Sequence, residues 1–243
     1  MIGLGILTRN RPAYFSQCVE SVIDNKRDLD YIVSYNDGSD SKYDMDYDIV
    51  RDTHKSEIEF INAVKNKGCS VSKNALLKKM LDRGCDHLFI LEDDVLIKSP
   101  DVFNRYIESA KKAGFGHLNF ALHGSANAGG YQFTDGNVDY YRECVGAFSY
   151  FTKEAIDKAG MFDENFHNAW EHCRLTQLMG DFGFTSPFWA FADCHGSNEL
   201  LKEIPGSIEN SSIRHNPEWE KNIKEGLAYW QSIDPNCPIE EYR

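Results

Sequence analysis

The stretch HLFILEDD, residues 87–94, joins an apolar segment directly to three acids. An apolar run without alternation is typical of a strand that helices cover on both faces, as in a parallel sheet. Because alternate side chains of a strand share a face, Glu92 and Asp94 are expected to point one way and Asp93 the other. Two carboxylates on one face of a buried strand end repel each other and lose hydration, and a bound divalent cation would relieve both penalties. This stretch therefore predicts a strand that ends at a metal and diphosphate site.

A plainer interpretation treats the three acids as a solvated loop edge or as the acidic start of a helix. The apolar residues Val95, Leu96 and Ile97 that follow the acids would be unusual after a solvated loop edge or at an acidic helix start. We therefore favour the metal site over the plainer interpretation.

Outward from this stretch, apolar strands alternate with amphipathic helices. Strands are expected over Ile2–Thr8, 31–35 and 58–61, and helices from Pro12 and over 71–81. A chain that alternates in this way forms a parallel sheet with right-handed crossovers and helices on both faces. Ligands bind such sheets beyond the carboxyl ends of the strands, so the polar residues that follow the strands should converge on one cleft.

The second half of the chain is less regular. Its expected elements are a helix around 102–107, a strand at 117–122, a flexible loop at 124–130, one or two strands in 140–152, a helix at 169–179, a strand at 184–192, a polar loop at 197–212 and a final helix at 219–233.

The composition is that of a folded globular domain with an acidic surface. Of the 243 residues, 42% are hydrophobic and 26% charged, which excludes disordered, collagenous and coiled-coil chains. A net charge of −12 disfavours binding to nucleic acid or to anionic membranes. The seven cysteines include no CxxC pair, and no apolar window could span a bilayer. The first strand lacks a signal-peptide cleavage pattern, so we expect a soluble cytoplasmic protein with reduced thiols.

Two further segments carry residue types suited to chemistry. Residues 66–70 precede a helix that contains Asn74, and they could present amides to a phosphate, although an ordinary capped junction explains them as well. Trp170 precedes Glu171 and His172, a combination that suits a general base beside an aromatic floor for a sugar. A helix start with an acid for the dipole and a core tryptophan is the plainer alternative.

Taken in order, these segments resemble the nucleotide-sugar glycosyltransferases of the GT-A fold, and within them glycosyltransferase family 2. The resemblance covers residues 2–196. The matching blocks are Leu7–Pro12 for the Thr-x-Asn-Arg-Pro-like turn, Asn36–Asp40 for the Asp-Asp-Gly-Ser-x-Asp turn, Asn66, Gly68 and Asn74 for the Asn-x-Gly…Asn element, Leu91–Val95 for the metal-binding DxD motif, and Gly160–Glu164 with Glu171-His172 for the acceptor-side motif.

The resemblance implies one α/β domain of GT-A type, with a Rossmann-like, mainly parallel sheet flanked by helices. Residues 1–98 would form its nucleotide-sugar half and residues 99–196 its acceptor half. Residues 197–243 would add a C-terminal loop and helix packed on the same domain.

The function implied by the resemblance is transfer of one sugar from a nucleotide-diphosphate sugar, most simply a UDP-sugar, to a hydroxyl on a glycan, a lipid-linked acceptor or a protein. Inversion is expected, and the chain lacks the Gln-x-x-Arg-Trp motif and membrane helices of processive relatives. Mn²⁺ or Mg²⁺ would be held by Glu92 and Asp94, with His195 as a third ligand. Asp37 would pair with the base, and the other donor-side residues implied are Thr8, Arg9, Asn10, Asn66, Gly68, Asn74 and Asp93.

Two residues depart from the family pattern. Glu92 replaces the first DxD aspartate, which is conservative for a hard cation. His172 stands where family relatives have an aspartate that resembles a catalytic base. Either His172 has that role here, or Glu171 has it. We favour Glu171 slightly, because a carboxylate there adds no further cation. A catalytically inactive nucleotide-sugar or carbohydrate-binding module on the same fold is the alternative.

Overall fold

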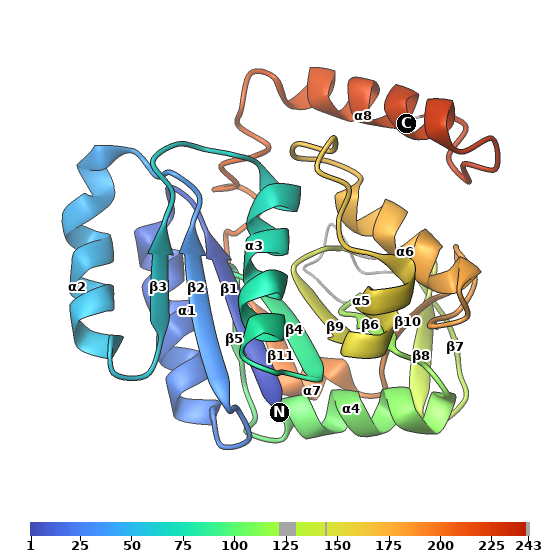
Figure 1. Ribbon diagram of the computed structural model, residues 1–243, viewed down its shortest axis with the longest axis horizontal. Helices are drawn as coiled ribbons and strands as arrows, with labels where there is room; N and C mark the ends of the chain where they lie inside the picture. Colours follow the sequence, from blue (N-terminus) through green and yellow to red (C-terminus); the bar gives the residue numbers. More distant parts are fainter. Residues whose placement is uncertain (122–129, 144, 242–243) are drawn as a thin grey trace.

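The computed structural model describes residues 1–121, 130–143 and 145–241 as layered strands and helices (Figure 1). The strands are β1 (Ile2–Thr8), β2 (Tyr31–Asn36), β3 (Glu59–Asn62), β4 (His87–Glu92), β5 (Val95–Ile97), β6 (His117–Asn119), β7 (Tyr131–Thr134), β8 (Val138–Tyr141), β9 (Phe148–Thr152), β10 (Phe191–Cys194) and β11 (Leu201–Glu203). The helices are α1 (Pro12–Asn25), η1 (Ser41–Tyr43), α2 (Asp44–His54), α3 (Cys69–Asp82), α4 (Val102–Ala113), α5 (Lys153–Ala159), α6 (Glu171–Asp181), α7 (Ser197–Leu200) and α8 (Trp219–Ile233). The loop expected at 124–130 lies outside the described residues except for Gly130.

The main sheet has the strand order β3-β2-β1-β4-β9-β6. Neighbouring strands from β3 to β4 are parallel, and β9 runs antiparallel to both β4 and β6. Thr8 pairs with Asn36 and Leu7 with Glu92, so β1, β2 and β4 end at the same edge. The predicted α/β class with a mainly parallel sheet is confirmed, and its strand ends converge as expected.

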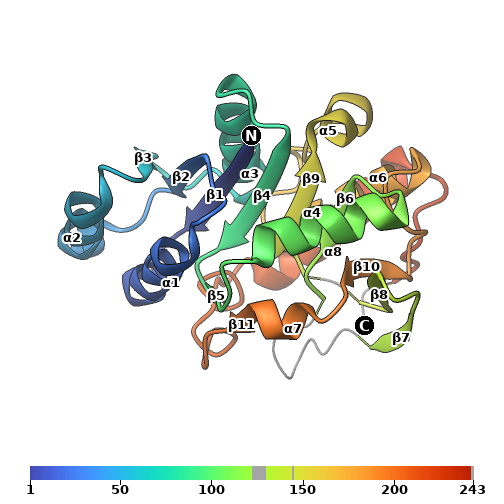
Figure 2. The same cartoon turned by 90° about the horizontal axis from the view of Figure 1, so that it is seen from below.

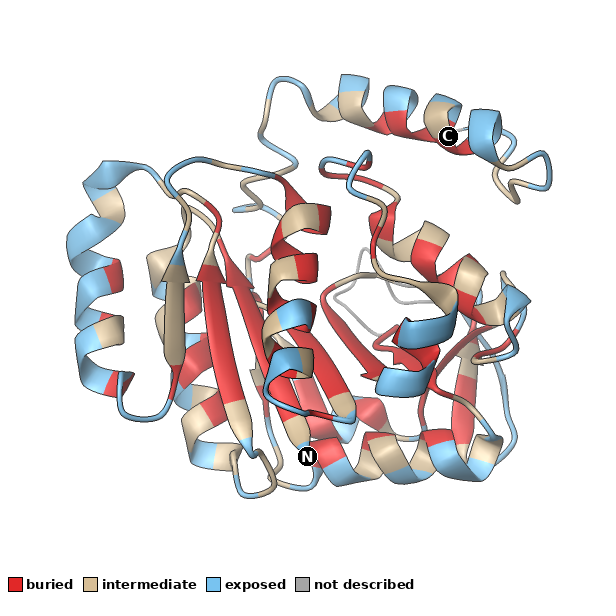
Figure 3. Cartoon of the chain, viewed as in Figure 1, coloured by how far each residue is buried: buried red, intermediate tan, exposed pale blue. Residues whose placement is uncertain are grey.

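Helices cover both faces of this sheet, with α3 on one face and α1 on the other (Figure 2). Alternate residues of β4 serve the two cores: Leu88 and Ile90 pack on the α3 side, and Phe89 and Leu91 on the α1 side. A Cβ on Gly5 would lie 2.8 Å from Cβ of Leu76, so the glycine allows α3 to approach β1 closely. The central strands are accordingly buried almost throughout (Figure 3).

Smaller elements complete the second half of the chain. A three-stranded sheet has the order β10-β8-β7, and β11 pairs with β5. The final helix α8 packs on α6, where its buried Trp230 donates a hydrogen bond to Gln177 Oε1 at 3.1 Å. Within the described ranges, no helix combines the length and the apolarity that crossing a bilayer requires.

Two features of local structure differ from what the sequence indicated. The acidic segment after β2, interpreted as a loop, contains the helix α2, whose buried residues Tyr47, Val50 and His54 recur at helical spacing on the side that packs inward. The strand expected at 184–192 is confined to β10, because Pro187 lacks a backbone donor and Trp189 adopts a φ of +72°, which interrupts an extended run.

Candidate active site

A cavity of about 940 Å³ opens beyond the end of β4. Four predicted residues line it: Glu92, Asp94, Glu171 and His172. The two acids come from the end of β4 and the turn after it, and the other two come from the first turn of α6. The fold thus brings together the expected metal-binding acids and the expected base, although they lie far apart in the sequence.

Arg11 is the counter-charge of the two aspartates. Its guanidinium forms ion pairs with Asp93 and with Asp94, the latter at 3.0 Å. Asp93 is fully buried, and Thr8 donates a hydrogen bond to it at 2.6 Å. Burial raises the pKa of Asp93 to about 7, against the opposing charge of Arg11. Asp93 therefore faces the interior, as strand alternation predicted, and anchors Arg11 rather than lining the cavity.

Lys73 joins the two acidic halves of the site. Its buried ammonium lies 2.8 Å from Oε1 of Glu92 and 3.1 Å from Oε1 of Glu171, and it also donates to the carbonyl of Gly146 at 3.3 Å. Burial alone would lower the pKa of Lys73, but the two carboxylates outweigh it and raise that pKa. A permanent cation on α3 thus fixes Glu92 relative to Glu171.

The two base candidates differ in charge. Burial alone would raise the pKa of Glu171, but the charge of Lys73 and the neighbouring His172 outweigh burial and lower it. Burial alone would lower the pKa of His172, but Cys173 and Glu171 raise it to about 10. At neutral pH Glu171 is therefore a carboxylate and His172 an imidazolium, so Glu171 is the residue able to accept a proton.

Asp37 and Asn66 hold the loop in front of α3. The carboxylate of Asp37 is buried and accepts hydrogen bonds from the amides of Lys67 at 2.8 Å and Gly68 at 3.0 Å. Asn66 Oδ1 also accepts from the amide of Gly68, at 2.8 Å. Both carboxylate oxygens of the expected base-reading residue are thus engaged by the backbone, and neither Asp37 nor Asn66 lines the cavity.

Other expected donor-side residues also serve the framework. The amide of Asn74 bonds the backbone of Phe162 in both directions, at 2.8 and 3.0 Å, and so pins the loop before α6. Asn10 joins the ends of β1 and β2 by accepting from the amide of Asp40 at 2.7 Å. Arg9, with its Nε buried and without a hydrogen-bond partner in the described chain, does not line the cavity.

His195 lies apart from the acids, at the end of β10. Its Nδ1 is 2.8 Å from Oδ1 of Asp139, and His195 is not among the residues that line the cavity. Within the described residues, no group of three or more His, Cys, Asp or Glu side chains is placed to hold a metal ion. Glu92 and Asp94 are thus the predicted ligands that face the cavity.

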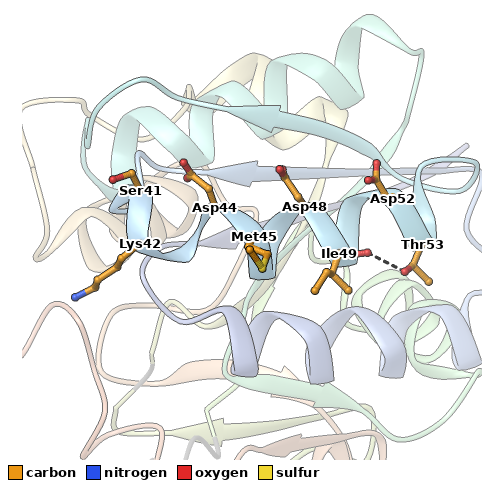
Figure 4. Close-up of a pocket in the computed structure, with 8 residues that line it drawn as sticks. All are labelled: Ser41, Lys42, Asp44, Met45, Asp48, Ile49, Asp52 and Thr53. Atoms are coloured by element: carbon orange, nitrogen blue, oxygen red, sulfur yellow. Dashed lines mark hydrogen bonds between the residues drawn. The ribbon is translucent and has the colours of Figure 1, made fainter.

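A second depression lies on the outer surface of α2 (Figure 4). Asp44, Asp48 and Asp52 are aligned along this helix beside Met45 and Ile49. It contains none of the residues expected to carry chemistry, so the cavity beyond β4 is the candidate active site.

Three residues important to the site were missed by sequence reasoning. Arg11 and Lys73 compensate the acids, and Asn168 is a buried residue that lines the cavity. The turn that contains Arg11 was part of the resemblance, but nothing in it showed that this side chain reaches the acids. For Lys73 and Asn168 we find no signal in the sequence.

The comparisons with known proteins concern the fold. By sequence, the chain matches no protein-family model and no curated protein. By structure, it is similar to the mannosyltransferase PcManGT from Pyrobaculum calidifontis, solved with GDP-Man and Mn²⁺, with a TM-score of 0.59 and 11% identity over 96% of this chain and 75% of that one.

Two further solved structures are similar in the same way. GalNAc-T7, solved with UDP, GalNAc and Mn²⁺, has a TM-score of 0.63 and 10% identity over 85% of this chain and 44% of that one. Residues 1–349 of S. aureus TarS, solved with UDP, give a TM-score of 0.58 and 13% identity over 98% of this chain and 74% of that one. The chain therefore has the fold of the GT-A glycosyltransferases.

Proposed function

We propose that the chain is a nucleotide-sugar glycosyltransferase of family 2 type that transfers one sugar to a hydroxyl acceptor, with inversion and without processivity. The observation that supports this best is that Glu92 and Asp94 line the same cavity as Glu171. Acids that can hold a cation and a carboxylate that can accept a proton are the two components that displacement at an anomeric carbon requires. Uridine is the simplest base, since GalNAc-T7 and TarS are both solved with UDP.

Glu92 and Asp94 would hold Mn²⁺ or Mg²⁺. Their carboxylate oxygens are hard ligands suited to either ion, and both residues face the cavity. Because the described residues offer no third protein ligand nearby, donor phosphates and water would complete the shell. When bound, the cation supplies Lewis-acid stabilisation of the leaving diphosphate. Arg11 keeps Asp94 in position, and Lys73 does the same for Glu92.

Glu171 would take the proton from the acceptor hydroxyl. Lys73 holds its Oε1 in place at 3.1 Å, and His172 lies beside it with Nδ1 3.5 Å from the same oxygen. The imidazolium of His172 adds positive charge next to the diphosphate site. His172 would therefore stabilise negative charge, and Glu171 would be the base.

Asp94→Asn tests the metal-binding half of the site. The substitution keeps the shape of the side chain and removes its charge, so we expect release of UDP from UDP-sugars with Mn²⁺ to fall roughly 100-fold. The matched control is Asp44→Asn on the exposed side of α2, which should keep full activity. An unchanged rate for Asp94→Asn, or full activity in EDTA, would remove the metal from the proposal.

Comparing Glu171→Gln with His172→Ala identifies which of the two residues acts as the catalytic base. We expect Glu171→Gln to lower transfer at least tenfold more than His172→Ala, because only Glu171 is deprotonated at neutral pH. Transfer and donor hydrolysis are measured separately, since loss of the base should affect transfer more. If neither variant loses more than about tenfold, the acceptor-side assignment is wrong.

The alternative is an inactive module that binds a nucleotide sugar or a carbohydrate. The ion pair between Lys73 and Glu171 favours it, because a carboxylate with a lowered pKa is a weak base. Binding of UDP-sugars with Mn²⁺, without any turnover over hours, would support this module over the enzyme.

A further inference from the structure

Besides the acids, the cavity is lined by aromatic side chains, which form an aromatic wall. Trp170, Phe188, Trp189, Phe191 and Trp219 line it. Trp189 is 43% exposed, whereas the neighbouring Phe191 is buried. The rings of Phe188 and Phe191 meet Trp189 at 82° and 67°, so neither is stacked parallel on its indole. Trp189 therefore presents an open aromatic surface to the cavity.

The backbone of Trp189 supports a role for this surface. Its φ of +72° lies in the left-handed region, which bulky residues rarely adopt. Such conformations persist where the surrounding structure or function demands them, and they concentrate at binding sites. Among the described residues, Trp170, which also lines the cavity, is the other tryptophan with a positive φ, of +71°.

The side-chain amide of Asn168 faces the same cavity and has no hydrogen-bond partner in the described part of the chain. The residue is only 9% exposed. Its amide atoms are not among the fully buried polar atoms that lack a partner, so they remain accessible from the cavity. Asn168 thus has two N–H donors and a carbonyl acceptor available to a ligand that fills the cavity.

The charge of the cavity restricts that ligand. Glu143, Glu240 and Glu241 line it together with Glu92, Asp94 and Glu171, against the two arginines Arg142 and Arg214 and the imidazolium His172. Arg11 and Lys73 already compensate Asp94, Glu92 and Glu171, so the remaining negative charge comes from Glu143, Glu240 and Glu241. This charge disfavours an anionic acceptor, and the carboxylates can accept hydrogen bonds from hydroxyls. The lining also contains too many charged side chains for an acyl chain alone. An uncharged ligand with an apolar face and many hydroxyls fits all three observations.

We propose that the part of the cavity at the aromatic wall is a binding site for a neutral pyranose, the terminal sugar of the acceptor. Its apolar C–H face packs on Trp189, and its hydroxyls bond Asn168 and the carboxylates at the rim. The identification of this sugar as the acceptor rests on the proposed function, whereas the binding site itself does not. Because Glu171 lines the same cavity, a hydroxyl of the bound sugar lies on the side of the base.

The test measures sugar binding to the full chain without nucleotide or metal. Saturation-transfer NMR and tryptophan fluorescence report on titrations with lactose, cellobiose, mannobiose and diacetylchitobiose, and glucose 6-phosphate serves as the anionic counterpart. We expect at least one neutral disaccharide to bind and the phosphate sugar not to bind. The octyl glycoside of the bound sugar distinguishes a lipid-borne acceptor from a free glycan, because an octyl chain that contacts the protein tightens binding.

Substitutions test whether the sugar binds at the aromatic wall. Trp189→Ala should weaken binding about tenfold, and Trp189→Phe less, because a smaller ring keeps part of the apolar surface. Trp189→Gly is the second variant, since glycine tolerates the positive φ and the fold is kept. Asn168→Ala should also weaken binding, whereas Phe182→Ala, an exposed phenylalanine that does not line the cavity, should leave it unchanged.

The outcomes separate the two proposals. Absence of binding by every neutral sugar, or binding that Trp189→Ala and Trp189→Gly leave unchanged, overturns the sugar site. Tight binding of glucose 6-phosphate overturns it as well. Sugar binding that depends on Trp189, without any turnover of UDP-sugars, supports the site and contradicts the transferase, because the binding assay contains neither nucleotide nor metal.

Discussion

Buried cations determine the protonation state of the acids in this site. Arg11 is mostly buried and compensates Asp93 and Asp94, while Lys73 compensates Glu92 and Glu171. Without these cations, neighbouring carboxylates in a desolvated site would take up protons. The protein thus keeps the acids ionised that would bind a metal and act as a base. One cation lies on each side of the main sheet: Arg11 directly before α1, and Lys73 on α3.

Arg11→Met is expected to destabilise the fold strongly, because it leaves the buried Asp93 without its counter-charge. Removing one partner of a buried ion pair typically lowers the free energy of unfolding by about 3–5 kcal/mol. The double variant Arg11→Met/Asp93→Asn should recover part of that loss, since it removes the buried charge of Asp93 and leaves Asp94 as the acid that has lost its cation. Urea denaturation at pH 7.5 measures the three free energies of unfolding.

The matched control for this cycle is Arg27→Met. Arg27 forms ion pairs with Asp28 and Asp101 at the surface, with its side chain 59% exposed, so its loss should change stability little. Equal losses for Arg11→Met and Arg27→Met, or no recovery in the double variant, would contradict the role of Arg11 as a buried counter-ion.

The start of α3 positions the start of α6. The amide of Cys69 donates to the carbonyl of His167 at 2.8 Å, and Ser70 donates to the carbonyl of Phe166. Lys73 then reaches Glu171 from the first turns of the same helix. The segment 66–70, expected to present amides to a phosphate, therefore lies against the loop that precedes α6 and orients the base.

Gly68→Ala should destabilise the contact between α3 and the loop before α6. The loss of stability should exceed the penalty of the positive φ alone. A Cβ at Gly68 would lie 2.5 Å from the carbonyl oxygen of His167, and its φ is +92°. Gly160 is the matched control, because its φ is +91° and nothing lies within 4 Å of its Cβ position. Gly160→Ala should lower the free energy of unfolding by about 1 kcal/mol, the penalty of the backbone alone.

Thermal melts and activity together check this pair. We expect Gly68→Ala to lower the melting temperature clearly more than Gly160→Ala and to lower transfer as well, because the loop before Glu171 must shift. The close contact between α3 and the 167–171 segment would be disproved by equal melting temperatures and equal activities of the two variants.

Across the molecule, one buried histidine links the main sheet to α6. His117 on β6 donates from Nδ1 to the carbonyl of Tyr150 on β9 at 2.9 Å, and its Nε2 lies 3.0 Å from the hydroxyl of Thr176 on α6. Burial lowers the pKa of His117 to about 4, although the bond to Tyr150 opposes the shift. The folded protein therefore holds this histidine neutral.

The stability of the whole fold should fall in acid because of this residue. The unfolded chain protonates His117 near pH 6.5, whereas the folded chain does so near pH 4, so the unfolded state binds more protons between these values. The contribution is present above about pH 6.5, decreases as the pH falls towards about 4, and amounts to about 3 kcal/mol at most. Urea denaturation from pH 7.5 to 4 measures it.

His117→Gln isolates this contribution from that of other groups. The variant should show a smaller decrease in stability over the same pH range, whereas His215→Gln, at an exposed histidine, should follow the unchanged protein. If the decrease is the same in His117→Gln as in the unchanged protein, another group is responsible for the acid sensitivity.

Much of the fold followed from local patterns. The boundaries of β1 and α8 were predicted as observed, and β4 was expected at 87–91. The helix α2 was missed because its acidic side dominates its composition, although Tyr47, Val50 and His54 recur at helical spacing. Asp37 and Asn74 were expected to contact the donor. In the structure Asp37 accepts hydrogen bonds from backbone amides, and Asn74 bonds the backbone of Phe162 and the side chain of Glu164. The residue types alone do not indicate these partners.

The amino-acid sequence by itself determined the strands and placed Glu92 and Asp94 at the end of one of them, because hydrophobic periodicity is a local property that acts along a few residues. Only the tertiary structure decided which cation faces which acid and which polar group has no partner. Lys73 meets Glu171 across 98 positions of the chain, and Asn74 meets Phe162 across 88. Contacts at such separations depend on how whole helices and loops pack, and no local pattern records that packing.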